Sequence, residues 1–385
     1  MVRDGRTCWY ADTALNPFVY SHPVEPEQLV DREADAVKLV ELAEGGHATR
    51  LSAPRRWGKT SLLYKVKADA EAAGMACVYV DLTRAVGLAD VAVTVEEAYR
   101  RGLQGAPRRA AVALIRAMNP RATATPGGIG VEVTPGVDPD LVRRFGDLLD
   151  IPVGLHKRTG TRTLVIFDEF QELLQAADQL DALVRARTQH HGAAASYIYA
   201  GSHPGLMREL FANRERPLFG QAQPLHLQPL TDPDLADYIG ERFAQTGREP
   251  GEALEPLLDI VEGHPQRAMM LAHHLWARTP PGATASAEGF GDALDAVRAE
   301  AKDALQATWN KLSHAERSVL AALAGGEAPL LSERSLRRFG IAKTTAREAR
   351  DRLVADGLLV EVDDRIAFAD PLLTDFAANR HGESR

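Results

Sequence analysis

The sequence predicts an α/β protein built on a parallel β-sheet of five strands, with helices on both faces of the sheet. Short apolar segments alternate with amphipathic segments up to about residue 230, which is typical of a parallel sheet that is buried on both faces. The pattern then becomes purely helical, and the C-terminal segment combines short helices with two adjacent strands. We therefore expect an N-terminal segment (1–46), a sheet domain (47–230), a helical domain (231–310) and a small C-terminal domain (311–385).

The five expected strands are, for the most part, short apolar runs bounded by residues typical of turns. They occupy residues 48–53, 77–82, 163–167, 196–200 and 223–227. Helical periodicity predicts helices over 27–44, 59–73, 90–118 and 139–156. Residues 119–138 are rich in Pro, Gly and Thr, which favours a surface hairpin or a mobile insertion.

Length and composition limit the possible classes of protein. A chain of 385 residues is longer than one ordinary core, and its 45% hydrophobic and 25% charged residues are those of a globular protein. Cys8 and Cys77 match no metal-binding spacing and suit a reducing compartment. The start lacks the apolar region of a signal peptide, and no run approaches the ~18 apolar residues that cross a bilayer. We predict a cytoplasmic protein without membrane insertion.

A nucleotide-binding loop follows the first expected strand. The segment matches G-x-x-x-x-G-K-[ST], with alanine in place of the first glycine, and it consists of Ala53, Pro54, Arg55, Arg56, Trp57, Gly58, Lys59, Thr60 and Ser61. Its backbone N–H groups would hold the phosphates, the Lys59 ammonium would reach the β- and γ-phosphates, and the Thr60 hydroxyl would ligate Mg²⁺. The alternative is an ordinary strand–helix loop with an exposed lysine. The strand before the motif and the amphipathic helix after it favour an ATP site with Mg²⁺.

Two acids, Asp168 and Glu169, follow the third expected strand. A buried strand often ends in a polar residue, which is the alternative interpretation. Together with the upstream loop, however, the pair predicts that Asp168 holds the magnesium shell and that Glu169 activates the attacking water as a general base. Hydrolysis of ATP is therefore the favoured reaction.

With these motifs assembled, the chain resembles the archaeal-type P-loop ATPases of the AAA+ and STAND-related lineage, which also occur in bacteria. The resemblance covers nearly the whole length and rests on the order and spacing of residues 29–33, 53–61, 167–171, 200–202 and 262–266. It implies a P-loop NTPase core of the AAA+ type, a helical lid and a C-terminal winged-helix domain.

The resemblance also implies roles for residues outside the two motifs. Val30 would lie near the adenine, Ser202 would orient the water or the γ-phosphate, His264 would sense the γ-phosphate and Pro265 would pack on the adenine. Each position has an alternative interpretation. The segment at Val30 would then be a helix start capped by Asp31, and Ser202 would belong to an ordinary Gly-Ser turn. His264 and Pro265 would form a helix start with proline in its first turn. Arg214 and Arg216 are candidate arginine fingers for a neighbouring subunit, and a solvated charged turn is the alternative. Gln221 stands where similar proteins often carry arginine, which leaves a functional homo-oligomer open.

The C-terminal segment has the outline of a winged helix. Helices are expected from Ser313, over 332–339 and over 342–355, followed by a hairpin around residues 363–364. The candidate DNA contacts at the start of the third helix are Lys343, Thr344, Thr345 and Arg347. Between Arg334 and Arg352 there are seven basic residues and two acidic ones, although the wing itself is acidic. The overall net charge of −8 argues against nucleic-acid binding by the whole surface.

Three functions fit these features. The first is an ATP-hydrolysing switch or motor that acts on a protein client. The second is a DNA-binding regulator in which ATP sets the affinity for DNA. The third is a scaffold that uses the nucleotide only to order an assembly, without hydrolysis.

Overall fold

The computed structural model describes residues 15–118, 138–176, 179–326, 340, 342–362 and 365–383. These residues form two compact units. The smaller unit combines the described residues up to His22 with Leu230–Lys311, and the larger unit holds the other described residues. The C-terminal segment thus belongs to the same unit as the sheet.

The larger unit is built on a parallel sheet of five strands in the order β2-β3-β4-β1-β5. The strands are β1 (Thr49–Ser52), β2 (Ala76–Asp81), β3 (Thr163–Asp168), β4 (Ala195–Gly201) and β5 (Gln223–His226). The structure confirms all five predicted strands, each within a residue or two of its expected bounds. In this order β4 lies between β1, which leads into the phosphate loop, and β3, which leads into the acidic pair.

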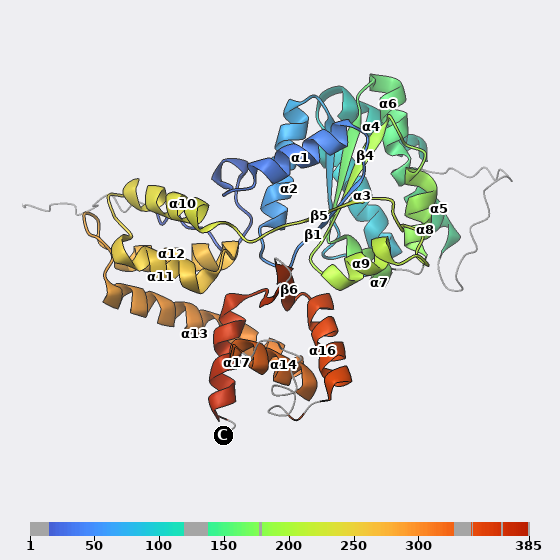
Figure 1. The fold of residues 1–385 in the computed structure, drawn as a ribbon. Helices are drawn as coiled ribbons and strands as arrows, with labels where there is room; N and C mark the ends of the chain where they lie inside the picture. The colour runs from blue at the N-terminus through green and yellow to red at the C-terminus, as the bar shows by residue number, and fades with distance from the viewer. Residues whose placement is uncertain are drawn as a thin grey trace, which may run out of the picture. The chain divides into compact units, whose positions relative to one another are not determined.

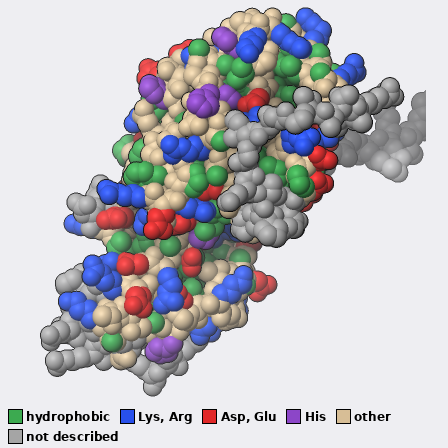
Figure 2. Space-filling view, turned by 90° about the vertical axis from the view of Figure 1, so that its right-hand side faces the viewer, with side chains coloured by type: hydrophobic (Ala, Val, Ile, Leu, Met, Phe, Trp, Pro, Cys, Tyr) green, Lys and Arg blue, Asp and Glu red, His purple; other side chains and the backbone are tan. Residues whose placement is uncertain are grey.

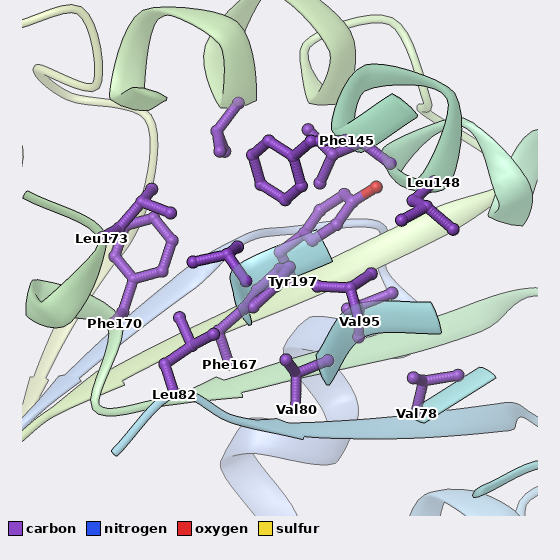
Figure 3. Packing of buried hydrophobic residues seen from close by; sticks show 14 of the residues in the cluster. Val78, Val80, Leu82, Val95, Phe145, Leu148, Phe167, Phe170, Leu173 and Tyr197 are labelled. Carbon is purple, nitrogen blue, oxygen red and sulfur yellow. The ribbon is translucent and has the colours of Figure 1, made fainter. Parts of the chain in front are cut away.

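Helices cover both faces of the sheet (Figure 1). One face packs against α1 (Glu33–Glu44) and α2 (Lys59–Ala72), where Leu39 and Leu62 are fully buried. The other packs against α3 (Leu88–Gly102), α4 (Gly105–Met118), α5 (Pro139–Leu149), α6 (Ile151–Thr159) and α8 (Leu180–Thr188). Figure 3 shows this second core, in which Phe145 lies beside Tyr197 and to which the valines of β2 also belong.

Three predicted helix bounds are wrong, each for a local reason. The first helix starts at Glu33 instead of residue 27, because Asp31 adopts a left-handed φ of +41° after a short 3-10 turn at Pro26–Gln28. The helix expected over 90–118 breaks at Leu103, whose backbone is extended. The helix expected over 139–156 divides at Asp150, just before Pro152, which cannot donate a backbone hydrogen bond. The insertion expected at 119–138 lies almost entirely outside the described residues.

The smaller unit is helical, as expected. It consists of α10 (Asp232–Ala244), α11 (Leu254–Val261), α12 (Pro265–Arg278) and α13 (Ala287–Lys311), with a 3-10 turn at Gly251–Ala253. The N-terminal residues pack into it, because the Phe18 ring lies 5.5 Å from that of Phe243 and the Asn16 amide donates to the His273 carbonyl at 3.0 Å. In the part of the chain that the structure describes, no helix is long and apolar enough to cross a membrane.

The described residues after Lys311, which we call the C-terminal module, contain three helices and a hairpin. The helices are α14 (His314–Ala324), α16 (Lys343–Ala355) and α17 (Pro371–Glu383), and β6 (Leu359–Val362) pairs antiparallel with β7 (Arg365–Phe368). Ser313 and Glu316 form the expected capping box of α14. The helix expected over 332–339 lies outside the described residues, and α17 was not predicted.

Candidate nucleotide-binding site

The phosphate loop occupies residues 53–58, between the end of β1 and the first residue of α2. Arg56 and Gly58 adopt left-handed backbone conformations, with φ of +69° and +80°. Alternation of right- and left-handed residues is the geometry in which successive N–H groups line a concave anion site. Ala53 is not among the residues with positive φ, so its methyl group causes no backbone strain. The alanine in place of the first glycine is therefore compatible with the loop.

Side chains of this loop face different environments. Arg55 and Arg56 are exposed, whereas Trp57 is only 4% exposed and its indole N–H donates to the Ala369 carbonyl at 3.0 Å. The Ser61 hydroxyl accepts a hydrogen bond from the Val24 N–H at 3.1 Å. The side chains of Trp57 and Ser61 therefore hold the loop within the protein, and a phosphate could reach only their backbone.

The predicted lysine, threonine and acidic pair meet at one place. The Lys59 ammonium, 6% exposed, lies 2.7 Å from Oε1 of Glu169 and 3.3 Å from Oδ1 of Asp168. The Thr60 hydroxyl donates to Oδ2 of Asp168 at 3.0 Å. Because the carboxyl ends of parallel strands lie at the same edge of the sheet, β1 and β3 deliver these four side chains to one site.

Glu169 is held by several donors. The Ser202 hydroxyl lies 2.5 Å from its Oε2, and the Gln171 amide donates to the same oxygen at 2.6 Å. Burial raises the pKa of Glu169, but the nearby Lys59 charge and the hydrogen bonds from Lys59, Ser202 and Gln171 outweigh it, so the pKa lies below its ordinary value. Glu169 is therefore ionised at neutral pH, as a general base must be.

Two residues of the site were not assigned a role from the sequence. The Tyr79 hydroxyl, on β2, donates to Oδ2 of Asp168 at 2.7 Å. Burial, and then the charge of Asp168, raises the pKa of Tyr79, so it remains a neutral donor. Gln171 is 1% exposed and holds Glu169. The only sequence signals were a tyrosine within an apolar strand and a glutamine two residues after Glu169.

The remaining predicted contacts to the nucleotide belong to other elements of the chain. Val30 is half-buried in the turn before α1, and Asp31 does not cap that helix, since the N-cap residue is Arg32. In the helical unit, His264 is the N-cap of α12, where its Nδ1 accepts from a backbone N–H at 3.3 Å, and Pro265 is the first residue of the helix.

The two candidate arginine fingers differ in their surroundings. Arg214 is exposed and has no ion pair among the described residues. Nε of Arg216 lies 3.4 Å from Oδ2 of Asp181, a carboxylate that is only 2% exposed, and 3.7 Å from Glu209. Arg216 therefore forms an ion pair with a buried acid of its own chain, which makes it a poorer candidate for an arginine finger than Arg214.

The candidate DNA contacts lie together on the first turns of α16. Lys343, Thr344, Thr345 and Arg347 are all exposed, whereas Ala346 is buried against the module. Among the described side chains on the face drawn in Figure 2, basic and acidic groups are interspersed.

The chain is similar in structure to two archaeal proteins. No family model matches the sequence, and no curated protein matches it. A Walker-type ATPase of Pyrococcus abyssi aligns over 94% of this chain and 99% of its own, with a TM-score of 0.67 and 18% identity. The ORC2 protein of Aeropyrum pernix, solved in ADPNP–ADP complexes, aligns over 96% and 99%, with a TM-score of 0.57 and 18% identity. Together with the strand order and the phosphate loop, these similarities show that the chain has a P-loop NTPase fold of the AAA+ type.

Proposed function

We propose that this protein binds ATP with Mg²⁺ and hydrolyses it, and that the cycle acts as a switch or motor on a partner. The observation that carries the proposal is the convergence of Lys59, Thr60, Asp168, Glu169 and Ser202 at the end of the sheet. The nucleotide complexes of the Aeropyrum protein, which shares the fold, support nucleotide binding.

The residues fit a magnesium–nucleotide complex. Among the described residues, no group of three or more His, Cys, Asp or Glu is placed to hold a metal ion. Mg²⁺ commonly keeps several waters and takes only one or two protein ligands together with substrate phosphates. Thr60 and Asp168, whose oxygens lie 3.0 Å apart, would supply those ligands. When bound, the ion would neutralise phosphate charge.

The remaining residues perform the protein's part of the reaction. The Lys59 ammonium would exchange its contact with Glu169 for the phosphates, which frees the carboxylate to accept a proton from water. Ser202 and Gln171 hold that carboxylate in a fixed orientation, so little reorganisation is needed as the water is deprotonated. We also propose that Val30, His264 and Pro265 contact the nucleotide. Arg214 is a better candidate than Arg216 for an arginine finger that would reach a neighbouring subunit in a homo-oligomer.

A Glu169→Gln variant tests the proposal. It should bind ATP with little change in affinity, because Lys59 and the loop remain, and lose about 10²–10⁴-fold in turnover. Glu41→Gln, at an exposed acid on α1, is the matched control and should leave both quantities unchanged. Lys59→Ala should lose ATP binding. Undiminished turnover in Glu169→Gln contradicts the assignment of the base. ATP binding without turnover in the wild-type protein would favour the non-hydrolysing scaffold.

A second candidate function is DNA binding by the C-terminal module. The observation that favours it is the exposure of Lys343, Thr344, Thr345 and Arg347 on the first turns of α16. If the winged-helix interpretation is correct, Arg347→Ala should weaken duplex binding and lower the salt dependence by about one phosphate contact. Absence of duplex binding at low salt removes this function.

A further inference from the structure

A cavity of about 500 Å³ lies within the larger unit, apart from the Lys59–Glu169 contact. Its walls come from β1, β5, the phosphate loop, the helix α9 (Pro204–Ala212) and the C-terminal module. This volume falls within the range of about 300–1,000 Å³ that is typical of small-molecule sites. Ala53, Pro54 and Trp57 of the phosphate loop line it, whereas Lys59, Thr60 and the acidic pair do not.

Three basic side chains line the cavity: Arg50 on β1, His226 on β5 and Arg208 on α9. The strands β1 and β5 are neighbours with Ser52 opposite His226, and Arg50 lies two residues before Ser52, so both side chains share one face of the sheet. Arg50 is half-buried. Within the described ranges, none of the three side chains makes a hydrogen bond or an ion pair.

The basic groups repel one another. Burial, and then the charge of Arg208, lowers the pKa of Arg50. Burial, followed by the charges of Arg50 and Arg208, lowers the pKa of His226. Arg50 is half-buried, whereas Arg208 and His226 are exposed. An anion bound among these three basic groups would relieve their mutual repulsion.

The remaining walls are largely apolar, with one acid. Trp57 and Met207 line the cavity from the loop and α9, and Leu359, Val360 and Glu361 line it from β6. No ion pair joins Glu361 to a described basic residue. The cavity therefore offers an apolar surface beside a basic end.

Close packing fixes the wall that the C-terminal module contributes. The Trp57 indole is hydrogen-bonded to the Ala369 carbonyl. A Cβ added at Gly205 would lie 2.7 Å from both Cβ and the carbonyl oxygen of Ala355, so α9 and α16 approach more closely than a side chain at that position would permit. The cavity is therefore a feature of the folded unit.

We propose that this cavity binds a small phosphorylated molecule, with its phosphate between Arg50 and Arg208 and its apolar part against the wall that includes Trp57 and Met207. Arginine binds phosphate bidentately and is less strongly hydrated than lysine, which suits the half-buried Arg50. A partly apolar cavity of this volume fits a mononucleotide-sized ligand.

Calorimetric titration of the full chain with AMP in EDTA tests the proposal, with inorganic phosphate as a competitor and adenosine as the ligand without phosphate. AMP lacks the β-phosphate that a P-loop binds, and Lys59→Ala should leave its affinity within about twofold. Arg208→Ala, an exposed position, should weaken AMP binding at least about tenfold, since a hydrogen bond to a charged group is lost. His226→Ala provides a second variant, and circular dichroism checks that both are folded.

Arg109→Ala, at an exposed arginine on α4 that does not line the cavity, is the matched control. Retained AMP affinity in this control, together with weak adenosine binding and displacement by phosphate, supports the site. The proposal is overturned if neither AMP nor phosphate binds at millimolar concentration, if Lys59→Ala abolishes AMP binding, or if Arg109→Ala weakens it as much as Arg208→Ala. Binding of a DNA duplex that depends on Arg208, without binding of AMP, would also overturn it.

Discussion

The buried amide of Gln171 is expected to set the acidity of the proposed general base. Its Nε2 donates to Oε2 of Glu169 at 2.6 Å, whereas its Oε1 is buried and accepts no hydrogen bond from the described residues. Gln171→Met keeps the length of the side chain and removes both groups. The loss of a hydrogen bond to a carboxylate costs about 1.5–3 kcal/mol, and removal of an unsatisfied buried carbonyl returns about 1–3 kcal/mol. The free energy of unfolding should therefore change by no more than about 2 kcal/mol.

Turnover, in contrast, should change with pH. The pKa of Glu169 is depressed in the folded protein, so the base is ionised, and its stabilising contacts present, until the pH falls through that lowered pKa. Without the Gln171 donor the pKa rises, and ATP hydrolysis should be lost at a higher pH than in the wild-type protein. On this acidic limb, a loss of about 1.5 kcal/mol corresponds to about tenfold lower turnover.

The measurement is the rate of ATP hydrolysis against pH, combined with urea unfolding of the same samples. Gln189→Met, at an exposed glutamine after α8, is the matched control and should leave the acidic limb in place. An unchanged acidic limb in a folded Gln171→Met protein would refute the proposed role of Gln171. An equal shift in Gln189→Met would show that the shift does not come from the contact with Glu169.

Two further predictions concern contacts that cross the larger unit. Trp57→Phe should lower the free energy of unfolding by about 1–3 kcal/mol, because the buried Ala369 carbonyl loses its hydrogen-bond donor. Urea unfolding measures this change, and a change below about 0.5 kcal/mol contradicts the prediction. Arg216→Ala should destabilise the protein by on the order of 2–3 kcal/mol, because Asp181 stays buried without its ion pair, whereas Arg214→Ala should change stability by less than about 0.5 kcal/mol. Thermal unfolding distinguishes the two, and equal effects would rule out the structural role of Arg216.

The local sequence was sufficient to predict the strands of the sheet and the two main motifs, the phosphate loop and the acidic pair. The apolar runs of β3 and β4 are buried along their whole length, whereas β5 exposes three of its four residues; all five strands were nevertheless predicted within a residue or two of their bounds. The phosphate loop is a contiguous segment, and its chemistry depends on residues that are close in sequence. Lys59 and Asp168 could be paired in advance because parallel strands end at the same edge of the sheet.

Helix boundaries followed less directly from the pattern. Periodicity predicted one helix over 90–118, yet the backbone is extended at Leu103. Apolar residues continue at helical spacing across such a break, so the pattern alone does not reveal it. The left-handed Asp31 is a similar case, because nothing in the sequence marks it as the end of a turn.

The sequence by itself determined the strands, the phosphate loop and the acidic pair, since each is specified by neighbouring residues. Only the tertiary structure decided which distant side chains complete the site and its surroundings: Tyr79 on Asp168, Trp57 on the Ala369 carbonyl, and Arg216 on Asp181. These pairs depend on strand order, register and the docking of the C-terminal module, which arise from packing across the whole unit. A pattern along the chain fixes the face on which a side chain lies, but not the residue that it meets there.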